Sequence, residues 1–194
     1  MLLAGDPLPH RPRRILVAGV SGSGKTTLAR RLSAVTGIPH TELDALHHGP
    51  QWTPRPEFLD DVRHLAARDE WITEWQYTSA RPLLAARADT LVWLDLPFPL
   101  TLARVVRRTL RRARTREVLW NGNVEPPLHT IFTDRENVVR WAISTRNKYK
   151  EQVPEAAAAH PSLTVVRLSS RADVERWMDG PVADLRRGTD DDGS

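Results

Sequence analysis

A lysine and a threonine that close a glycine-rich run are the residues of this chain best suited to chemistry. The run is Gly19-Val20-Ser21-Gly22-Ser23-Gly24-Lys25-Thr26, which fits the phosphate-binding pattern G-x-x-x-x-G-K-[ST]. Residues 15–18 before it favour a strand and residues 27–32 after it favour a helix, so backbone amides would surround a phosphate chain. In such a P-loop the lysine reaches the β- and γ-phosphates and the threonine hydroxyl binds Mg²⁺. We expect ATP and Mg²⁺ to bind here, at Gly22, Ser23, Gly24, Lys25, Thr26 and Thr27.

Two aspartates stand where predicted strands end. Asp44 follows the extended stretch 38–43, where a carboxylate can hold Mg²⁺ or accept a proton from a substrate hydroxyl. It could instead cap a short helical turn, but its place in the expected crevice favours the functional interpretation. Asp95 ends the apolar strand 90–95 and could orient water bound to Mg²⁺, or it could cap the turn before Pro97.

A second polar group is expected on the acceptor side of the site. Glu74-Trp75-Gln76-Tyr77 ends the third strand and offers a carboxylate, an indole, an amide and a phenol for a ring or polar substrate. The alternative is ordinary packing of the two aromatic rings with Glu74 exposed. His47 and His48 invite a zinc hypothesis, but no third ligand stands at metal spacing, and contact with the acceptor is favoured. The expected acceptor-side residues are Asp44, His47, Glu74, Gln76, Tyr77, Asn121 and Arg146.

Arginine dominates the stretch from 104 to 116. Helical spacing predicts one face with Arg104, Arg108 and Arg111, while an apolar side is expected to be buried by Leu102, Val105, Val106 and Leu110. Beside a P-loop, such arginines suit a lid, at about residues 113–128, that neutralises charge on the transferring phosphoryl group. Arg108 and Arg112 are the expected catalytic arginines. A solvated helix face and a nucleic-acid-binding patch are the alternatives.

The elements that must position these residues alternate along the chain. Strands are expected at 14–18, 38–43, 71–73, 90–95 and 163–168, and helices at 25–36, 57–68, 81–87, 100–112, 134–150 and 172–178. Apolar strands separated by helices predict an α/β fold, with a parallel sheet covered on both faces. Ligands of such sheets bind at the carboxyl ends of the strands. We expect a flexible leader at 1–12, a single domain at 13–182 and a flexible acidic tail at 183–194.

Composition narrows the class of protein. The 194 residues contain no cysteine, which excludes disulfides, thiolate metal sites and a cysteine nucleophile. No stretch approaches the length of apolar residues that spans a membrane, and the first residues lack the features of a signal peptide, so we expect a cytoplasmic protein. The formal net charge is +4, and the only lysines are Lys25, Lys148 and Lys150, so the basic residues are almost all arginine, which suits phosphate recognition.

Together these motifs resemble the nucleoside-monophosphate-kinase superfamily of P-loop proteins, and more closely the bacterial adenylate-kinase-like proteins, some of which are described as DNA topology modulation proteins. The resemblance runs from about Arg14 to Trp177 and is carried by the P-loop, by 42–47 and 87–97, and by the arginine helix with 119–125. It implies a three-layer P-loop kinase fold with five parallel strands, a mobile lid, ATP and Mg²⁺. By this resemblance the loop Ser169-Ser170-Arg171 packs against adenine, so Arg171 is an expected nucleotide contact.

The acceptor remains open at this point. Adenylate kinases carry an Asp-Gly-Phe-Pro-Arg-type motif where this chain has Glu74-Trp75-Gln76-Tyr77, so a nucleotide or a small hydroxy metabolite is possible, as in shikimate or gluconate kinases of similar build. We expect a kinase that transfers the γ-phosphoryl group of ATP and is a monomer or a homodimer. The alternative is a nucleotide-binding regulator that contacts nucleic acid through its arginine helix, with little turnover.

Overall fold

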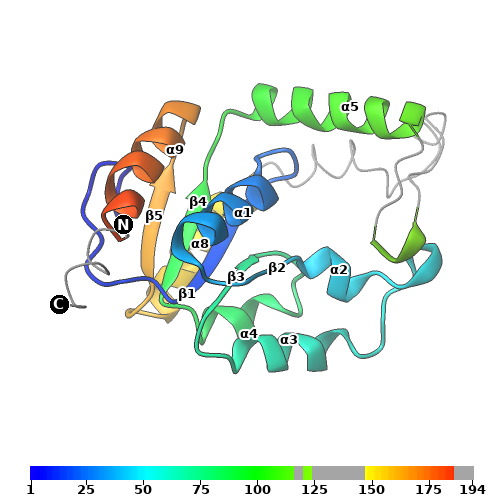
Figure 1. Cartoon of the computed structure of the whole chain (residues 1–194), viewed down its shortest axis with the longest axis horizontal. Helices are drawn as coiled ribbons and strands as arrows, with labels where there is room; N and C mark the ends of the chain where they lie inside the picture. The colour runs from blue at the N-terminus through cyan, green and yellow to red at the C-terminus, as the bar shows by residue number, and fades with distance from the viewer. Residues whose placement is uncertain (116–119, 124–146, 186–194) are drawn as a thin grey trace.

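Five parallel strands form the centre of the computed structural model, which describes residues 1–115, 120–123 and 147–185. Their order is β2-β3-β1-β4-β5 (Figure 1). The bounds are β1 Arg14–Gly19, β2 His40–Thr41, β3 Trp71–Glu74, β4 Thr90–Leu94 and β5 Thr164–Leu168. Every pairing is parallel, so all five carboxyl ends meet at one edge, as the sequence predicts. The P-loop follows the central strand.

Alternating side chains of the strands supply two cores, one on each face of the sheet. On β1, Leu16 and Ala18 face one core while Ile15 and Val17 face the other, and all four are at most 1% exposed. Burial on both faces explains why these strands read as continuous apolar runs rather than as alternating patterns.

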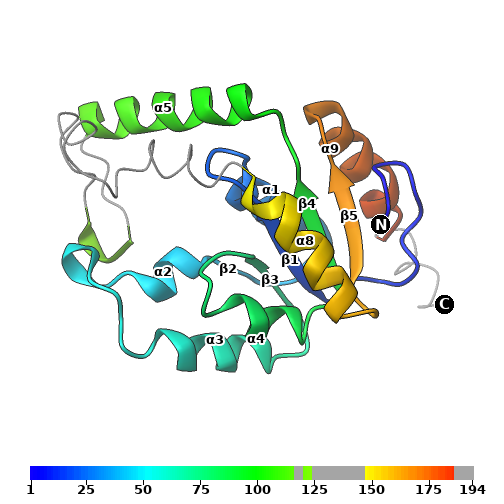
Figure 2. The ribbon, with the colours of Figure 1, turned by 180° about the vertical axis from the view of Figure 1, so that it is seen from behind.

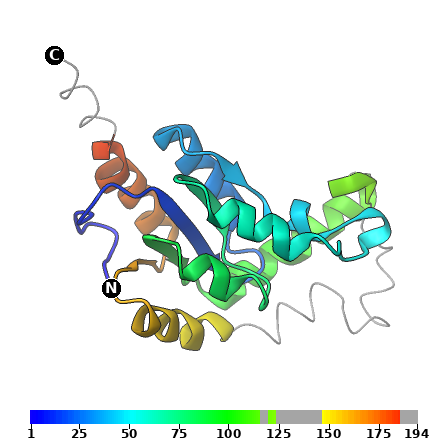
Figure 3. The ribbon, with the colours of Figure 1, turned by 90° about the horizontal axis from the view of Figure 1, so that it is seen from below.

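Helices cover both faces and make the fold three-layered. Figures 1 and 2 show the two sides, and Figure 3 shows α1 and α9 on one side of β1 with α4 and α8 on the other. The helical elements are α1 Lys25–Thr36, α2 Leu43–His47, η1 Pro50–Trp52, α3 Phe58–Ala66, α4 Arg81–Ala85, α5 Phe98–Thr115, η2 Trp120–Gly122, α8 Lys148–Ala159, α9 Arg171–Trp177 and η3 Met178–Val182. The predicted α/β class and helix-covered parallel sheet are confirmed.

Two helix boundaries differ from the sequence prediction. The helix expected to end at about residue 150 instead begins its described part at Lys148 and continues to Ala159, with Pro154 inside it. Helix α5 extends to Thr115, three residues beyond its expected end and into the stretch expected to be an irregular arm. The rest of the arm beyond residue 123 and the predicted helical residues 134–146 lie outside the described residues.

The orientation of α5 is the main correction to the sequence analysis. Its inward residues are Thr101, Val105 and Thr109, which are at most 5% exposed. Of the four apolar residues expected on the buried side, only Val105 is buried, whereas Val106 and Leu110 are 37% and 42% exposed. Arg104, Arg108 and Arg112 are half-buried on the inward face, so the helix turns part of its arginines toward the protein. Arg111, predicted to share a face with Arg104 and Arg108, is exposed instead.

The first residues pack against the sheet, which differs from the expected flexible leader. Leu2 forms a parallel bridge with Val166 of β5, its N–H donating to the Val165 carbonyl at 2.7 Å and its carbonyl accepting from Arg167 at 2.9 Å. Ala4 is 4% exposed in the core that includes α1 and α9. The segment therefore covers the outer edge of β5, and Figure 1 shows it in blue beside that strand.

Candidate functional site

Glycines give the P-loop the backbone geometry of a phosphate cradle. Gly22 and Gly24 have φ values of 77° and 96°, in the region that side chains disfavour, and Gly24 is the N-cap of α1. A Cβ on Gly22 would lie 2.3 Å from the carbonyl oxygen of Thr101, so the start of α5 packs directly on this loop. The Ser23 hydroxyl is buried with no hydrogen-bond partner among the described residues. This is expected of a group that donates to an anionic oxygen of a bound ligand.

Lys25 lies at the centre of a charged cluster. Its Nζ donates to the Val20 carbonyl at 3.3 Å, which holds the side chain back over the loop. Burial lowers its pKa to about 8; Asp44 and Glu74 oppose this shift, while Arg108 and Arg81 add to it. Two carboxylates and two guanidinium groups are therefore close enough to Lys25 for their charges to matter.

Glu74 is buried behind the loop, close enough to Thr26 for that side chain to help lower its pKa. The carboxylate accepts from the Leu43 N–H at 3.3 Å and lies 3.2 Å from His40 Nε2. Burial would raise the pKa of Glu74, but the His40 hydrogen bond and charge outweigh it, and the pKa is lowered. At 2% exposed, Glu74 is neither the exposed carboxylate of the packing alternative nor one of the residues grouped around Asp44. Thr27 is exposed on α1.

Four of the expected acceptor-side residues meet beside the P-loop. Gln76 Nε2 and the Tyr77 hydroxyl each donate to Asp44 Oδ1 at 2.6 Å. The ring of His47 stacks on Tyr77 with 4.0 Å between centroids and 15° between planes. These residues come from the start of α2 and from the loop after β3, two segments that the parallel sheet brings to the same edge.

The two histidines that suggested zinc face each other and the phenol. Their Nδ1 atoms are 3.4 Å apart, and His48 Nε2 is 3.1 Å from the Tyr77 hydroxyl. Burial, followed by the charge of His48, lowers the pKa of His47, which favours its neutral form. Among the described residues no group of three or more His, Cys, Asp or Glu side chains could hold a metal ion. A Mg²⁺ ion would therefore depend on phosphate oxygens as well as on protein ligands, as Mg²⁺ commonly does with nucleotides.

An asparagine that the sequence analysis missed fastens η2 to the acceptor side. Asn123 is 4% exposed, donates to the Gly49 carbonyl at 2.9 Å and accepts from the Trp52 N–H at 3.0 Å. Asn121, an expected substrate contact, donates its side-chain amide to the His48 carbonyl. The Asn-Gly turn signal indicated a turn here but could not identify its partners, which lie more than 70 residues away. Arg146, also expected on the acceptor side, lies outside the described residues.

Arg81 is a second residue of the site that the sequence analysis did not predict. Its guanidinium lies over the rings of Trp75 and Tyr149, 5.2 and 5.0 Å from their centroids, and donates to the Tyr149 hydroxyl at 3.1 Å and to Gln152. It is 7% exposed, and its charge contributes to the lowered pKa of Lys25. Arg81 thus fixes α4 to α8 and adds positive potential beneath the P-loop.

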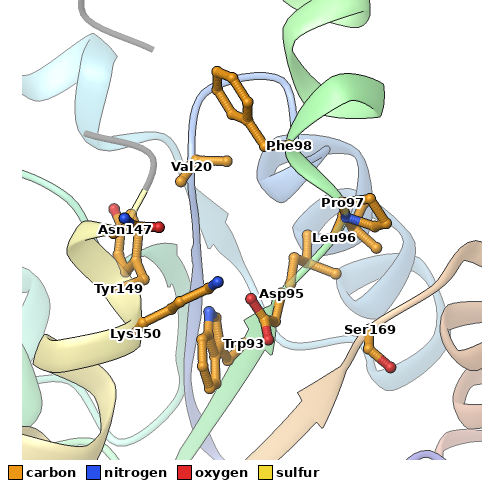
Figure 4. Close-up of a pocket in the computed structure, with 11 residues that line it drawn as sticks. Val20, Trp93, Asp95, Leu96, Pro97, Phe98, Asn147, Tyr149, Lys150 and Ser169 are labelled. Carbon is orange, nitrogen blue, oxygen red and sulfur yellow. The ribbon is translucent and has the colours of Figure 1, made fainter. Parts of the chain in front are cut away.

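The Asp95 side chain is directed to β5. It accepts from Arg167 Nε at 2.9 Å and from Arg167 NH2 at 2.6 Å, and the guanidinium lies over the Trp93 ring at 5.3 Å. Asp95 also lines a cavity of about 300 Å³ between the P-loop, the β4–α5 connection and α8 (Figure 4). Ser169 lines it too, whereas Arg171 is exposed at the first position of α9, after a capping box of Ser170 and Asp173.

Solved structures share this fold at low sequence identity. A gluconokinase from Sinorhizobium meliloti 1021 superposes with a TM-score of 0.50 and 20% identity, over 94% of this chain and 98% of that chain. A shikimate kinase from Bacteroides thetaiotaomicron gives a TM-score of 0.50 and 12% identity, over 93% and 99%. No protein-family profile and no curated protein matches the sequence. The likeness supports the predicted P-loop kinase fold.

No helix in the described part of the chain is long and apolar enough to cross a membrane.

Proposed function

We propose that this protein is an ATP-dependent kinase that transfers the γ-phosphoryl group to a nucleotide or a small hydroxy metabolite. The observation that carries the proposal is that the P-loop lysine Lys25 is held over the loop by the Val20 carbonyl at 3.3 Å and is near enough to Asp44 for the carboxylate charge to act on it. A phosphate-binding lysine and an acceptor-side carboxylate therefore share one cluster, which is the juxtaposition that phosphoryl transfer requires.

On the nucleotide side, the amides of residues 22–27 and the Lys25 ammonium would hold the phosphates. The positive φ angles of Gly22 and Gly24 and the buried Ser23 hydroxyl, which has no partner among the described residues, fit this role. The Thr26 hydroxyl would bind Mg²⁺, which neutralises charge on the phosphates when bound. The base would occupy the cavity lined by Asp95, Pro97 and Ser169. Arg171 stays a predicted nucleotide contact.

On the acceptor side, Asp44 is the proposed base. Both hydrogen bonds that it receives end on Oδ1, which leaves Oδ2 for the acceptor hydroxyl. That hydroxyl would give its proton to Oδ2 as its oxygen attacks the γ-phosphorus, and the bond from phosphorus to the ADP oxygen would break. Arg108 and Arg112, on the inward face of α5, would neutralise the charge that develops on the phosphoryl group. Arg146 stays a predicted acceptor-side residue.

A screen of acceptors with Mg·ATP tests the proposal. Nucleoside monophosphates and polyhydroxy acids such as gluconate and shikimate, the substrates of the enzymes with a similar fold, form the first set. With an accepted compound, Asp44→Asn should lower kcat about a hundredfold or more while ATP affinity persists, because the amide keeps the shape and loses the base. Asp69→Asn, on the exposed turn before β3 at the opposite edge, is the matched control and should keep full activity. Full turnover in Asp44→Asn would return Asp44 to a structural role.

A further inference from the structure

Tyr77 has a left-handed backbone conformation, which is unusual for a bulky residue. Its φ of 58° lies in the left-handed region, which costs a bulky residue on the order of 1 kcal/mol or more. The strain accompanies a specific placement: the ring lies flat on His47 and edge-on to Phe58, and the hydroxyl reaches Asp44 Oδ1 at 2.6 Å. A strained residue retained at a candidate site points to a role for that placement.

With both imidazoles neutral, the hydrogen bonds described around Tyr77 fit one assignment of protons. An ionised Asp44 only accepts, so the single Tyr77 proton is donated to Oδ1 and the phenol oxygen accepts from His48 Nε2, 3.1 Å away. A neutral His48 with its proton on Nε2 has a bare Nδ1, which accepts from His47 Nδ1 at 3.4 Å. In this order every link has one donor and one acceptor.

We propose that His47, His48 and Tyr77 form a hydrogen-bonded positioning chain that fixes the rotation of Asp44, so that Oδ2 faces the acceptor. The inference rests on the proposed function, because Asp44 has an acceptor to face only if the protein is a kinase. Hydrogen bonds to a carboxylate are short and strong, and the second donor on Oδ1, Gln76 Nε2, adds to the restraint. Tyr77 and Gln76 thus act on Asp44 rather than on the substrate, and the histidines serve orientation, not metal binding.

The proton assignment is measurable without any turnover. Long-range ¹H–¹⁵N imidazole spectra at neutral pH should show His48 protonated on Nε2 and His47 on Nδ1. Tyr77→Phe keeps the ring that stacks on His47 and removes the oxygen that accepts from His48. The His48 signals should then shift toward a mixture of tautomers. Two results would contradict the proposed hydrogen-bonded chain. One is a His48 proton on Nδ1 in the wild type, and the other is a set of His48 signals that do not change in Tyr77→Phe.

Steady-state kinetics tests whether the hydrogen-bonded chain of His47, His48 and Tyr77 positions Asp44. Tyr77→Phe should lower kcat between about tenfold and about a hundredfold, the scale for a misplaced reacting group, with an unchanged KM for ATP. His48→Gln keeps a donor at the Nε2 position and should stay within about threefold of wild type, whereas His48→Phe should lose as much as Tyr77→Phe. His64→Gln, exposed on α3, is the neutral control.

The outcomes separate this inference from the proposed function. Wild-type kcat in Tyr77→Phe, or equal loss in His48→Gln and His48→Phe, would overturn the positioning role while the kinase assignment stands. The assigned tautomers in a protein that phosphorylates no acceptor would contradict the kinase assignment and, with it, the role of the chain in orienting a base.

Discussion

The fold changes the acid–base chemistry of Lys25. Its folded pKa of about 8 lies below the ordinary value of 10.5 because the ammonium is desolvated among other charges. The unfolded chain therefore holds this proton more tightly than the folded one. As pH rises from about 8 to about 10.5, Lys25 makes the free energy of unfolding increase, and the contribution is lost again as pH falls through about 8.

The same proton makes ATP binding depend on pH. Phosphates favour the charged lysine, so ATP affinity should fall as pH rises through about 8, by up to about tenfold per pH unit for one linked proton. Calorimetric titration between about pH 7 and about pH 9.5 measures it. Lys25→Arg keeps a charge that does not titrate in this range, so its affinity should be nearly independent of pH. An equally steep dependence in that variant would assign the proton to another group.

The sequence could predict those residues of the site that the strand-end rule alone brings together. Asp44, His47, Gln76 and Tyr77 follow strand ends, and the parallel-sheet rule alone is enough to bring them to one edge. Glu74 and Asp95 also stand at strand ends, but Glu74 pairs with His40 of the neighbouring strand β2 and Asp95 with Arg167 of β5. The rule that brings strand ends to one edge does not say that a carboxylate turns back to a basic side chain of an adjacent strand, so the burial of Glu74 and the ion pair of Asp95 could only be found in the fold.

At the scale of the element, α5 shows what periodicity can and cannot decide. A repeat of 3.6 residues limits which side chains can share a face, and it correctly joined Arg104 and Arg108, whereas Arg112 rather than Arg111 joins them on the inward side. It does not determine which face is buried. Hydrophobicity predicted burial of Leu102, Val105, Val106 and Leu110, but of these only Val105 is buried, where it packs with Thr101 above Gly22.

This orientation separates two neighbouring arginines on α5. Arg108 is half-buried and its charge lowers the pKa of Lys25, whereas Arg107 is exposed. Arg108→Ala should lower kcat about tenfold or more with a small change in KM for ATP, because its charge acts on the transferring group. Arg107→Ala should remain within about twofold, the scale of a surface change. Steady-state kinetics of the pair measures the difference, and equal losses would contradict a specific role of Arg108 at the transferring group.

A second measurement on Arg108→Ala checks its distance from Lys25. Removing a positive neighbour raises the pKa of a lysine, so the fall of ATP affinity with pH should begin at a higher pH than in wild type. Arg107→Ala should leave that profile in place. An unshifted profile in Arg108→Ala would place its charge away from the phosphates.

At the scale of the whole molecule, the order of the strands determines where the parts of the candidate site lie. The P-loop follows β1 in the middle of the sheet, the Asp44 cluster gathers on the β2–β3 side, and the Asp95 cavity lies on the β4–β5 side. Alternating strand and helix signals were sufficient to predict the layers. They could not show that the first residues cover the outer edge of β5, because a short segment rich in proline carries no strand pattern.

That edge gives a prediction for the molecule as a whole. Deleting residues 1–5 removes two backbone hydrogen bonds to β5 and the buried Ala4, and should lower the free energy of unfolding by about 1–3 kcal/mol. It also exposes the backbone of an edge strand, so aggregation on heating should increase. Leu3→Ala, at a side chain 61% exposed, is the control and should change neither property. Because the deletion lies on the opposite side of β5 from the P-loop strand, kcat below the melting temperature should be unchanged. Chemical denaturation and light scattering measure both effects, and wild-type stability in the truncated protein would restore these residues to a flexible leader.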